Sequence, residues 1–458
     1  MATITKADKL SVRTKLMYGV GDAGVNLADT MVGLLFAIFL TDVVGLRPGL
    51  AAVALFIGRS SDYINDPIIG FISDRTRSRW GRRRPFILFG MLPFALAYML
   101  LWWKPPIDTQ IGLAIYYSVA FILYDTAATI LYMPYFAMTP ELTSDYDERT
   151  TLTTYRMAFS IIGAMIAFVV PLAIIGTMGP ENASRVMAVG AGVACLSILP
   201  MLLVFFGTRE RAEFQTLEQP TLKQSLKAAL KNRPFLYAIG IFLLTWTALD
   251  VLQTVLLYFL KYRMNLAGNG DLIFGLLFGT ALISLPFWQW AARRWDKQRA
   301  YIGGMIFLCA VMIGLGFMDP AWGLPVMGIL AGLAGIGLGA IQLLTWSMIP
   351  DAIEWDELQT GQRHEGMFYS LVTTFRKIGV SISIPLVMLM LEWTGYIANA
   401  DVQPPGAILG IQLLIGPIPA ACLVVGIILA AFYPLNRSRH AELRAKLAER
   451  QAAEGTNE

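Results

Sequence analysis

Charged side chains are scarce in this chain. They make up 15% of its 458 residues, whereas about 25% is usual in a soluble globular domain. Hydrophobic residues reach 56%, and they form many long runs that contain almost no charge. Because a helix needs about 20 apolar residues to cross the hydrocarbon of a bilayer, the composition excludes an ordinary soluble domain. It predicts an all-α membrane protein with many spans.

Histidine and cysteine are scarce too. The two histidines, His364 and His440, lie in polar segments, and the three cysteines, Cys195, Cys309 and Cys422, fall within apolar runs. The cysteines therefore cannot form a disulfide framework. The sequence contains no nucleophile-base pair, no metal motif and no P-loop. We therefore expect no enzymatic activity and no cofactor, and an ion gradient rather than ATP as the source of energy.

The apolar runs predict twelve transmembrane helices. Their expected ranges are 16–42, 49–74, 85–104, 110–138, 151–177, 184–207, 234–262, 271–292, 300–318, 322–349, 367–396 and 406–433. The first run follows a basic N-terminus, is too long for a signal peptide and has no cleavage site after it. We therefore expect the first helix to be retained.

The loops between these helices sort by charge. One side collects the N-terminal tail, the arginine-rich stretch 75–84, the segment 208–233, the loop 293–299 and the C-terminal tail. Basic loops face the cytoplasm, which predicts an integral protein of the bacterial inner (cytoplasmic) membrane with both termini cytoplasmic. These loops also account for the net charge of +4. Since no basic stripe interleaves with aromatic residues on a soluble domain, we expect no nucleic-acid partner.

A six-helix unit is repeated along the chain. The segments R-W-G-R-R-R-P-F (79–86), M-T-P-E-L (138–142) and T-Y-R-M (154–157) recur as R-W-D-K-Q-R-A-Y (294–301), M-I-P-D-A (348–352) and T-F-R-K (374–377). Parallel repeats are typical of carriers that work by alternating access. The predicted domains are an N-terminal six-helix bundle (1–207), a cytoplasmic central loop (208–233), a C-terminal six-helix bundle (234–433) and a cytoplasmic tail (434–458).

Two acids, Asp62 and Asp66, lie inside a long apolar run. An ionisable residue at membrane depth is costly and indicates a functional site by default. On a helix, two carboxylates four residues apart share one face and repel each other unless a cation or a proton sits between them. Arg59, one turn earlier, can neutralise one of them, and the alternative is a structural Arg–Asp cluster. Asp22 and Asp125 are further acids within predicted spans, and the sequence leaves their roles open.

Several motifs together resemble a known family. The segment 70–85, G-F-I-S-D-R-T-R-S-R-W-G-R-R-R-P, resembles the loop signature of the major facilitator superfamily. Four other segments resemble the glycoside-pentoside-hexuronide:cation symporters, the group of the melibiose carrier. They are Y-G-V-G-D-A-G (18–24), T-D-V-V-G-L (41–46), R-S-S-D-Y-I-N-D-P-I-I-G (59–70) and D-A-I-E-W-D-E-L-Q-T-G-Q-R-H-E-G (351–366). The resemblance implies the major facilitator fold, with two pseudo-symmetric six-helix bundles.

The resemblance also implies that Asp62 and Asp66 bind the coupling cation. Oxygen ligands suit a hard cation such as Na⁺, and two carboxylates serve H⁺ equally well. Thr129 matches a position whose hydroxyl contributes to this site in the melibiose carrier. On its own, a threonine in a membrane helix more often bonds to its own backbone.

The substrate site departs from the family pattern. The resemblance places an acidic pair around the sugar at Asn26 and Tyr132, and neither residue is acidic here, although both can hydrogen-bond to hydroxyls. Arg156 and Lys377 are retained, which leaves the central cavity more positive and suits an anionic sugar such as a hexuronide or a sulfonated sugar. The alternative is that each cation pairs with a carboxylate, with Asp62 or Asp66 as a plausible partner for Lys377.

Aromatic residues complete the predicted substrate site. Trp246 and Asp250 are one turn apart, which places a ring and an acceptor on one helix face, an arrangement often used to hold a sugar ring. Tryptophan is frequent in membrane helices in any case, so a role in packing is the alternative. Trp346 and Thr373 are the remaining candidates.

Charges at the cytoplasmic ends of the predicted helices form a predicted inner gate. Acids of the segments 141–150 and 351–366 are expected to pair with arginines of the loops after the second and eighth helices, and to separate when the carrier opens inward. The alternative is that these are solvated loop charges. The predicted gating residues are Asp74, Arg75, Arg82, Glu141, Arg149, Asp351 and Arg363.

Together these features predict a monomeric, cation-coupled symporter that carries a sugar or glycoside by alternating access. One alternative keeps the fold and moves a lysolipid or another amphipathic solute, as distant members of the same group do. The other is a membrane sensor that binds without transporting, which the short tails disfavour.

Overall fold

The computed structural model describes residues 10–143, 146–209, 229–360, 365–435, 439 and 442–443. Helices and their connections account for all of this part of the chain, which contains no strand. The first half contains α1 (Val12–Gly19), α2 (Gly21–Ile38), the π-helix η1 (Phe39–Val44), α3 (Pro48–Ser60), α4 (Asp62–Arg75), α5 (Arg84–Trp102), α6 (Gln110–Ala137), α7 (Thr139–Leu142), α8 (Tyr146–Ile175) and α9 (Ala183–Gly207). The second half contains α11 (Arg233–Tyr258), the π-helix η4 (Phe259–Arg263), α12 (Gly270–Trp295), α13 (Lys297–Gly316), α14 (Gly323–Thr360), α15 (Glu365–Trp393), α16 (Pro405–Ile415) and α17 (Pro417–Ala431).

Eleven helices within the described residues are long and apolar enough to cross a membrane. They lie close to the predicted spans, and the all-helical membrane fold is confirmed. The predicted span 49–74 is present as α3 and α4 but is not among the eleven. This stretch breaks at Ser61 and carries the charges of Arg59, Asp62 and Asp66, which lower its hydropathy.

One predicted boundary was wrong. The helix expected over 322–349 continues as α14 to Thr360, so Asp351 lies on a helix and not in a loop. The reason is that the apolar helical period continues beyond the predicted end, because Ala352 and Ile353 are 0% and 1% exposed.

The chain divides into two compact units. Unit 1 is Met1–Leu217 with Ile384–Pro404, and unit 2 is Glu218–Ser383 with Pro405–Glu458. The division falls inside α15, whose first part belongs to unit 2 and whose last turns belong to unit 1. The predicted domain limits, which place all of α15 in the C-terminal bundle, stay a prediction.

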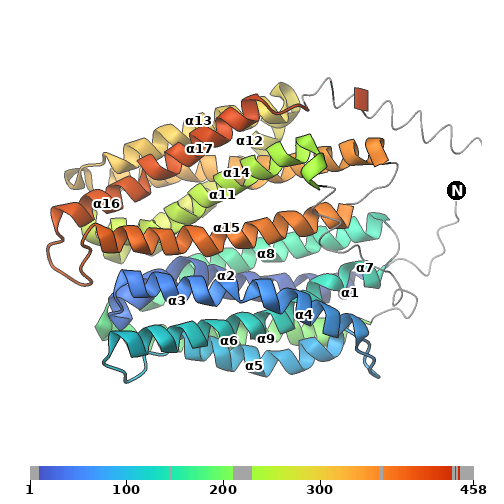
Figure 1. Ribbon diagram of the computed structural model, residues 1–458, viewed down its shortest axis with the longest axis horizontal. Helices are drawn as coiled ribbons and strands as arrows, with labels where there is room; N and C mark the ends of the chain where they lie inside the picture. The colour runs from blue at the N-terminus through green and yellow to red at the C-terminus, as the bar shows by residue number, and fades with distance from the viewer. Residues whose placement is uncertain are drawn as a thin grey trace, which may run out of the picture. The chain divides into compact units, whose positions relative to one another are not determined.

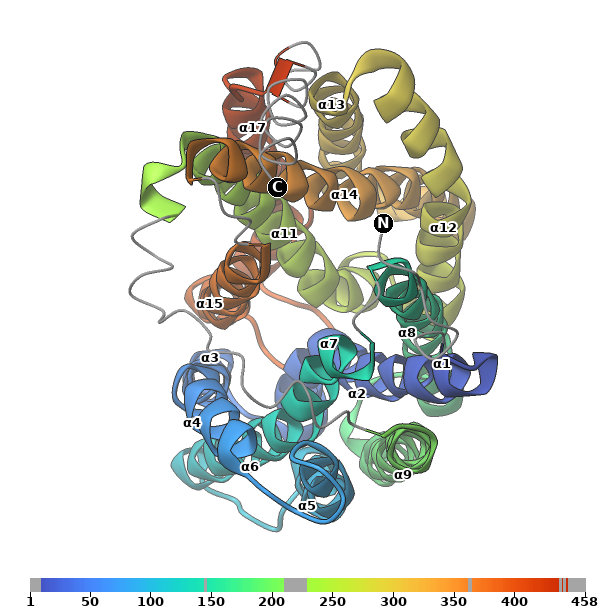
Figure 2. The same ribbon diagram turned by 90° about the vertical axis from the view of Figure 1, so that its right-hand side faces the viewer.

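Unit 1 is held together by aromatic packing and by close helix contacts. Phe36 packs against the rings of Trp102, Tyr117 and Phe121 with centroids 5.5 to 6.2 Å apart. A Cβ on Gly163 would lie 2.3 Å from the carbonyl oxygen of Ala23, so glycine at this position lets α8 approach α2 closely. Within this unit α5 lies beside α6 and α9 (Figure 1, Figure 2).

The segment 384–404 is tied to the first helices of unit 1 by buried polar contacts. Asp42 is 0% exposed, and its carboxylate accepts hydrogen bonds from Tyr396 and, at 2.8 Å, from Thr41. Its backbone carbonyl accepts from Asn399 Nδ2 at 2.7 Å. A carboxylate that loses its water on burial needs such donors, so Asp42 fixes this segment on unit 1.

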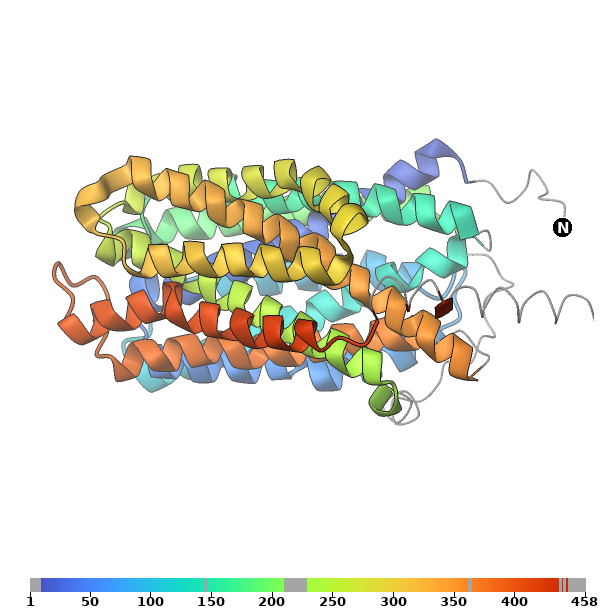
Figure 3. The same ribbon diagram turned by 90° about the horizontal axis from the view of Figure 1, so that it is seen from above.

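Unit 2 repeats the helical layout with its own elements. α14 packs between α12 and α13, and α11 packs on α17. α16 and α17 follow one another and together form one candidate membrane span, Pro405–Ala431 (Figure 3).

Candidate functional site

The acid pair lies directly after the break between α3 and α4. Ser61 separates the two helices, and Asp62 is the first residue of α4. The hydroxyl of Ser61 donates to the carbonyl oxygen of Gly58 at 2.6 Å, a local bond with which serine competes against regular helix. The N-terminus of a helix carries partial positive charge, and Asp62 lies at this end of α4.

Thr129 joins the two carboxylates. Its Oγ1 lies 3.4 Å from Asp62 Oδ1 and 3.2 Å from Asp66 Oδ1, and α4 lies beside α6 (Figure 2). A hydroxyl has one proton to donate, so it serves only one of the two acceptors at a time. A cation of the size of Ca²⁺ takes oxygens at about 2.4 Å, which puts neighbouring ligands about 3.4 Å apart. The distances from the Thr129 hydroxyl to one oxygen of each carboxylate therefore match the spacing of neighbouring ligands in a cation shell.

A row of polar contacts fixes α4 against α6 around this triad. The Ser61 hydroxyl has one proton to donate and lies 2.7 Å from Asp125 Oδ2, which is an alternative acceptor to the Gly58 carbonyl oxygen. Asn65 Nδ2 donates to Thr126 Oγ1 at 2.8 Å. Asp125, whose role the sequence left open, is thus an acceptor one turn before Thr129 on α6. These two contacts fix the position of α4 along α6, and at this position Thr129 lies next to both acids.

Arg59 has a different neighbour from the expected one. Its guanidinium lies over the ring of Phe121, 5.5 Å from the centroid, a cation–π contact. Within the described residues no ion pair joins it to a carboxylate. In the same part of the chain no cluster of three or more acids, cysteines or histidines could hold a metal ion.

Arg156 pairs with Asp22 inside unit 1. Arg156 Nε donates to Asp22 Oδ2 at 2.8 Å, and the carboxylate is almost fully buried. Arg156 Nη1 also donates to Thr139 Oγ1 at 3.1 Å, and the guanidinium lies 4.9 Å from the ring centroid of Phe136. The structure therefore gives Arg156 the carboxylate partner that the sequence held open as an alternative, and that partner is Asp22. Substrate contact by Arg156 stays a prediction.

Asp250 pairs with Arg376 inside unit 2. Two hydrogen bonds of 2.6 and 2.7 Å join the guanidinium to both carboxylate oxygens, and the guanidinium lies 4.9 Å from the ring centroid of Trp246. The ring and the acceptor predicted to hold a sugar thus hold Arg376. Sequence reasoning selected the neighbouring Lys377 and missed Arg376, although the internal repeat aligns Arg376 with Arg156.

The other predicted substrate residues of unit 2 lie on α14 and α15, close in sequence or in space to this pair. Trp246 Nε1 donates to Thr345 Oγ1 at 3.3 Å, and Trp346 packs edge-on against Phe242 with centroids 4.8 Å apart. Thr373 is exposed and donates to a carbonyl of its own helix, and Lys377 is partly exposed next to Arg376.

Asn26 and Tyr132 lie in unit 1. Asn26 is partly exposed and donates to the carbonyl oxygen of Asp22 at 3.0 Å. Tyr132 is 5% exposed, and its hydroxyl has no hydrogen-bond partner within the described residues. Both stay predicted substrate residues.

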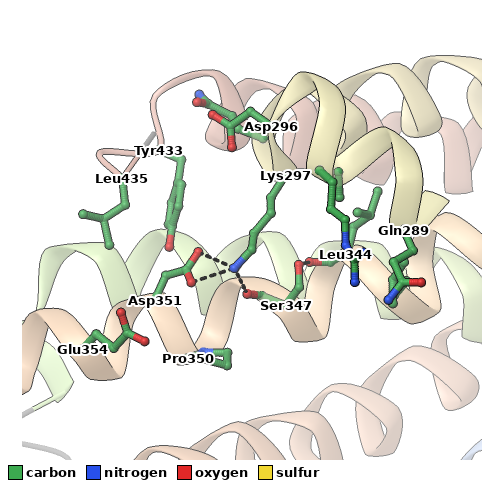
Figure 4. A pocket seen from close by; sticks show the side chains of 14 residues that line it. Gln289, Asp296, Lys297, Leu344, Ser347, Pro350, Asp351, Glu354, Tyr433 and Leu435 are labelled. Carbon is green, nitrogen blue, oxygen red and sulfur yellow. Dashed lines mark hydrogen bonds and ion pairs between the residues drawn. The ribbon is translucent and has the colours of Figure 1, made fainter. Parts of the chain in front are cut away.

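One of the predicted gating acids has a defined partner. Lys297 Nζ lies 2.7 Å from Asp351 Oδ1 and also donates to the carbonyl oxygen of Ser347 (Figure 4). The partner is a lysine, whereas an arginine was expected, and both residues belong to unit 2. They line a pocket of about 580 Å³ that Tyr433 also lines, and burial raises the pKa of Tyr433 well above its usual range.

The remaining gating residues are only partly described. Arg75 lies over the ring of Phe71, 3.8 Å from the centroid, and Arg82 is partly exposed. A residue that was not predicted, Arg83, is 4% exposed and donates to Ser73 Oγ at 2.7 Å at the end of α4. The side chains of Asp74, Glu141 and Arg149 and the whole of Arg363 lie outside the described part of the structure.

The chain is similar to known transporters over nearly its whole length. Residues 17–437 match the model of a family described as MFS/sugar transport protein. An uncharacterized symporter from Synechocystis is 33% identical, with 98% of this chain and 99% of that protein covered. The sodium-dependent lysophosphatidylcholine symporter 1-A of Danio rerio is 28% identical, with 94% and 87% covered. An uncharacterized symporter from Bacillus subtilis is 28% identical, with 96% of each chain covered.

Solved structures resemble the fold. A crystal structure of the nucleoside transporter NupG superposes with a TM-score of 0.65 and 14% sequence identity, with 93% of this chain and 100% of that chain covered. At this identity the similarity concerns the fold alone, and it confirms the major facilitator architecture.

Proposed function

Because the chain belongs to the family of MFS/sugar transport proteins, we propose that it is a cation-coupled symporter and that Asp62, Asp66 and Thr129 bind the coupling cation. The observation that supports this proposal is the distance of 3.2 to 3.4 Å from the Thr129 hydroxyl to one oxygen of each carboxylate. The repulsion between the two acids is relieved when Na⁺ or H⁺ lies between them. A cation that favours the substrate-binding conformation raises substrate affinity, and by linkage the substrate raises cation affinity by the same factor.

The first candidate substrate is a sugar or glycoside, in line with the description of the family. The expectation of an anionic sugar depended on the positive charges of Arg156 and Lys377. Since Asp22 neutralises that arginine, the case for a positive cavity is weaker, and a neutral glycoside becomes as good a candidate as a hexuronide or sulfonated sugar.

The second candidate is a lysolipid. A relative that is 28% identical over 94% of this chain is a sodium-dependent lysophosphatidylcholine symporter, which favours an amphipathic substrate and Na⁺ as the cation. The two candidates share the cation site and differ in the substrate alone.

Uptake into proteoliposomes distinguishes these candidates. The purified full-length protein is given labelled neutral glycosides, hexuronides, sulfonated sugars and lysolipids, under an imposed Na⁺ gradient, an H⁺ gradient or none. We expect one class to accumulate only under a gradient of its coupling cation. Accumulation of none of them in any condition, from protein shown to be folded, would refute the proposal.

Transport by this fold requires a bilayer and no partner chain, so we propose a functional monomer in the bacterial inner membrane. Both termini are proposed to be cytoplasmic because the basic loops gather on their side. Accessibility of single cysteines introduced in the tails to a membrane-impermeant reagent, in intact and in opened cells, tests this orientation.

A further inference from the structure

A groove with a mostly apolar lining lies between α12, α13 and α14 of unit 2. Its volume is about 740 Å³, within the range of about 300–1,000 Å³ that is usual for small-molecule sites. α14 packs against both α12 and α13 (Figure 2). The large aliphatic and aromatic residues of its lining are Ile283, Phe287, Trp288, Trp295, Phe307, Leu333 and Ile336. The groove shares no residue with the proposed cation site, which belongs to unit 1.

The apolar wall of this groove is open on one side. On α12, Ile283 is 79% exposed, Phe287 46% and Trp295 49%. On α13, a Cβ added to the exposed Gly303 would meet no atom within 4 Å. Both helices are long and apolar enough to span a membrane, where acyl chains are as apolar as these side chains. The groove therefore has the chemistry and the room to hold an acyl chain.

One end of the groove carries a positive charge. Arg299 lines this end together with Trp295, at the point where α12 ends and α13 begins. Its side chain is exposed, and within the described residues it forms no ion pair. The neighbouring Lys297, in contrast, pairs with Asp351. Arg299 also lies in the first turn of α13, where the helix dipole adds positive potential. The charge at this end is thus available to an anion.

Aromatic rings indicate the depth of this end in the membrane. Trp295 packs against Trp290 with centroids 5.5 Å apart, and Trp290 packs against Phe287 with centroids 6.0 Å apart. Tryptophan gathers at the membrane–water interface, at the level of the lipid headgroups. The loop 293–299 is proposed to face the cytoplasm, and basic side chains on that side attract anionic lipids. Arg299 is therefore at headgroup depth, while the apolar lining extends along the spans.

We propose that this groove binds an anionic phospholipid of the cytoplasmic leaflet, with an acyl chain between α12 and α13 and the phosphate at Arg299. The described residues that line the groove include one cation and no acid, so the lining attracts a phosphate and offers no partner to the ammonium of a zwitterionic headgroup. This site is distinct from the transport pathway, and the proposal does not depend on which solute the protein carries.

The test measures how tightly the first lipid binds to the purified full-length protein in detergent. Native mass spectrometry gives the apparent dissociation constants of dioleoylphosphatidylglycerol, which is anionic, and of dioleoylphosphatidylcholine, which is zwitterionic. For the wild type we expect phosphatidylglycerol to bind about fivefold more tightly, the effect of one basic side chain near the headgroup. Equal binding of the two lipids would make the occupant a lipid of either kind and would overturn the proposal.

The headgroup contact is tested by Arg299→Gln. This variant should bind the two lipids with about equal affinity, because it removes the cation from the groove. Arg294→Gln is the matched control. Arg294 is an exposed arginine in the last turn of α12 that does not line the groove, so its variant changes the net charge equally and should keep the preference. An unchanged preference in Arg299→Gln, or an equal loss in both variants, overturns the contact with Arg299.

The acyl-chain contact is tested by Gly303→Leu, which fills the groove. Both lipids should bind about tenfold more weakly, the effect of displacing about two methylene groups. Gly192→Leu on α9 is the matched control, because this exposed glycine also has no atom within 4 Å of an added Cβ and lies outside the groove. Equal affinities in the two leucine variants overturn the proposal. Displacement of phosphatidylglycerol by lysophosphatidylcholine at lower concentration also overturns it, since the groove would then be a site for an amphipathic solute.

Discussion

Arg376 holds Asp250 through two parallel hydrogen bonds, with donor and acceptor atoms 2.6 and 2.7 Å apart. The carboxylate side chain is 9% exposed and the arginine side chain 23% exposed. Bidentate geometry and burial together make this a strong contact. A second buried pair, Arg156 with Asp22, has the same relation in unit 1, and the internal repeat aligns the two arginines.

Breaking the pair in unit 2 should destabilise the protein. Arg376→Gln leaves the carboxylate of Asp250 buried without its partner, which costs about 3–5 kcal/mol. Arg376→Lys keeps the charge but loses the second hydrogen bond, so its cost should be smaller. Thermal unfolding of the purified protein in detergent measures both. The double variant Asp250→Asn/Arg376→Gln should recover much of the loss, and additive losses would contradict the coupling.

The cation triad should control the driving force. Asp62→Asn or Asp66→Asn should abolish accumulation against a gradient, because either change removes half of the negative charge that attracts the cation. Thr129→Val removes one neutral oxygen, and the cation concentration for half-maximal uptake should rise about tenfold, the equivalent of one hydrogen-bond-sized contribution. Initial rates of uptake at varied Na⁺ and pH give this value.

Thr126→Val is the matched control for the triad. Thr126 lies on the same helix as Thr129, accepts a hydrogen bond from Asn65 and is not one of the three proposed ligands. Its cation dependence should stay within about twofold of the wild type. Retained cation-driven accumulation in both aspartate variants would refute the assignment of the site.

The pair in unit 1 decides between two roles of Arg156. If its role is to neutralise Asp22, each single variant, Asp22→Asn or Arg156→Gln, should lose about 3–5 kcal/mol of stability. The double variant should then recover stability and transport together. If Arg156 contacts the substrate as well, the double variant should be stable but should bind substrate more weakly. Unfolding and half-saturating substrate concentration are measured side by side.

Lys297 and Asp351 should contribute little to stability. The lysine side chain is 37% exposed, and such solvent-screened pairs are worth at most about 1 kcal/mol. Because both residues lie in unit 2, we expect Lys297→Gln to leave the rate of substrate exchange within about twofold of the wild type. A larger change in rate, absent from Lys297→Arg, would instead support the predicted role in the inner gate.

The spans and the acid pair were selected from local signals, whereas Thr129 was selected from the family resemblance, and the role of all three residues as cation ligands stays a prediction. Apolar runs of membrane length are local, and charges inside them stand out. Partners across helices are not local, so the pairing of Asp250 with Arg376 was missed. The repeat carried a usable signal for Arg376, since T-F-R-K aligns with T-Y-R-M.

The break at Ser61 divides the second predicted span into two helices, α3 and α4. α4 has 14 residues and is about 21 Å long at 1.5 Å per residue. A change of about 3° in the angle between α3 and α4 would therefore displace the far end of α4 by about 1 Å. Asp62 and Asp66 lie in the first turns of α4, where the displacement would be small, and the arginine-rich loop begins at the far end of this helix. The same change of angle would thus move the arginine-rich loop further than the ligand oxygens, and the position of Ser61 in the span sets the ratio of the two displacements.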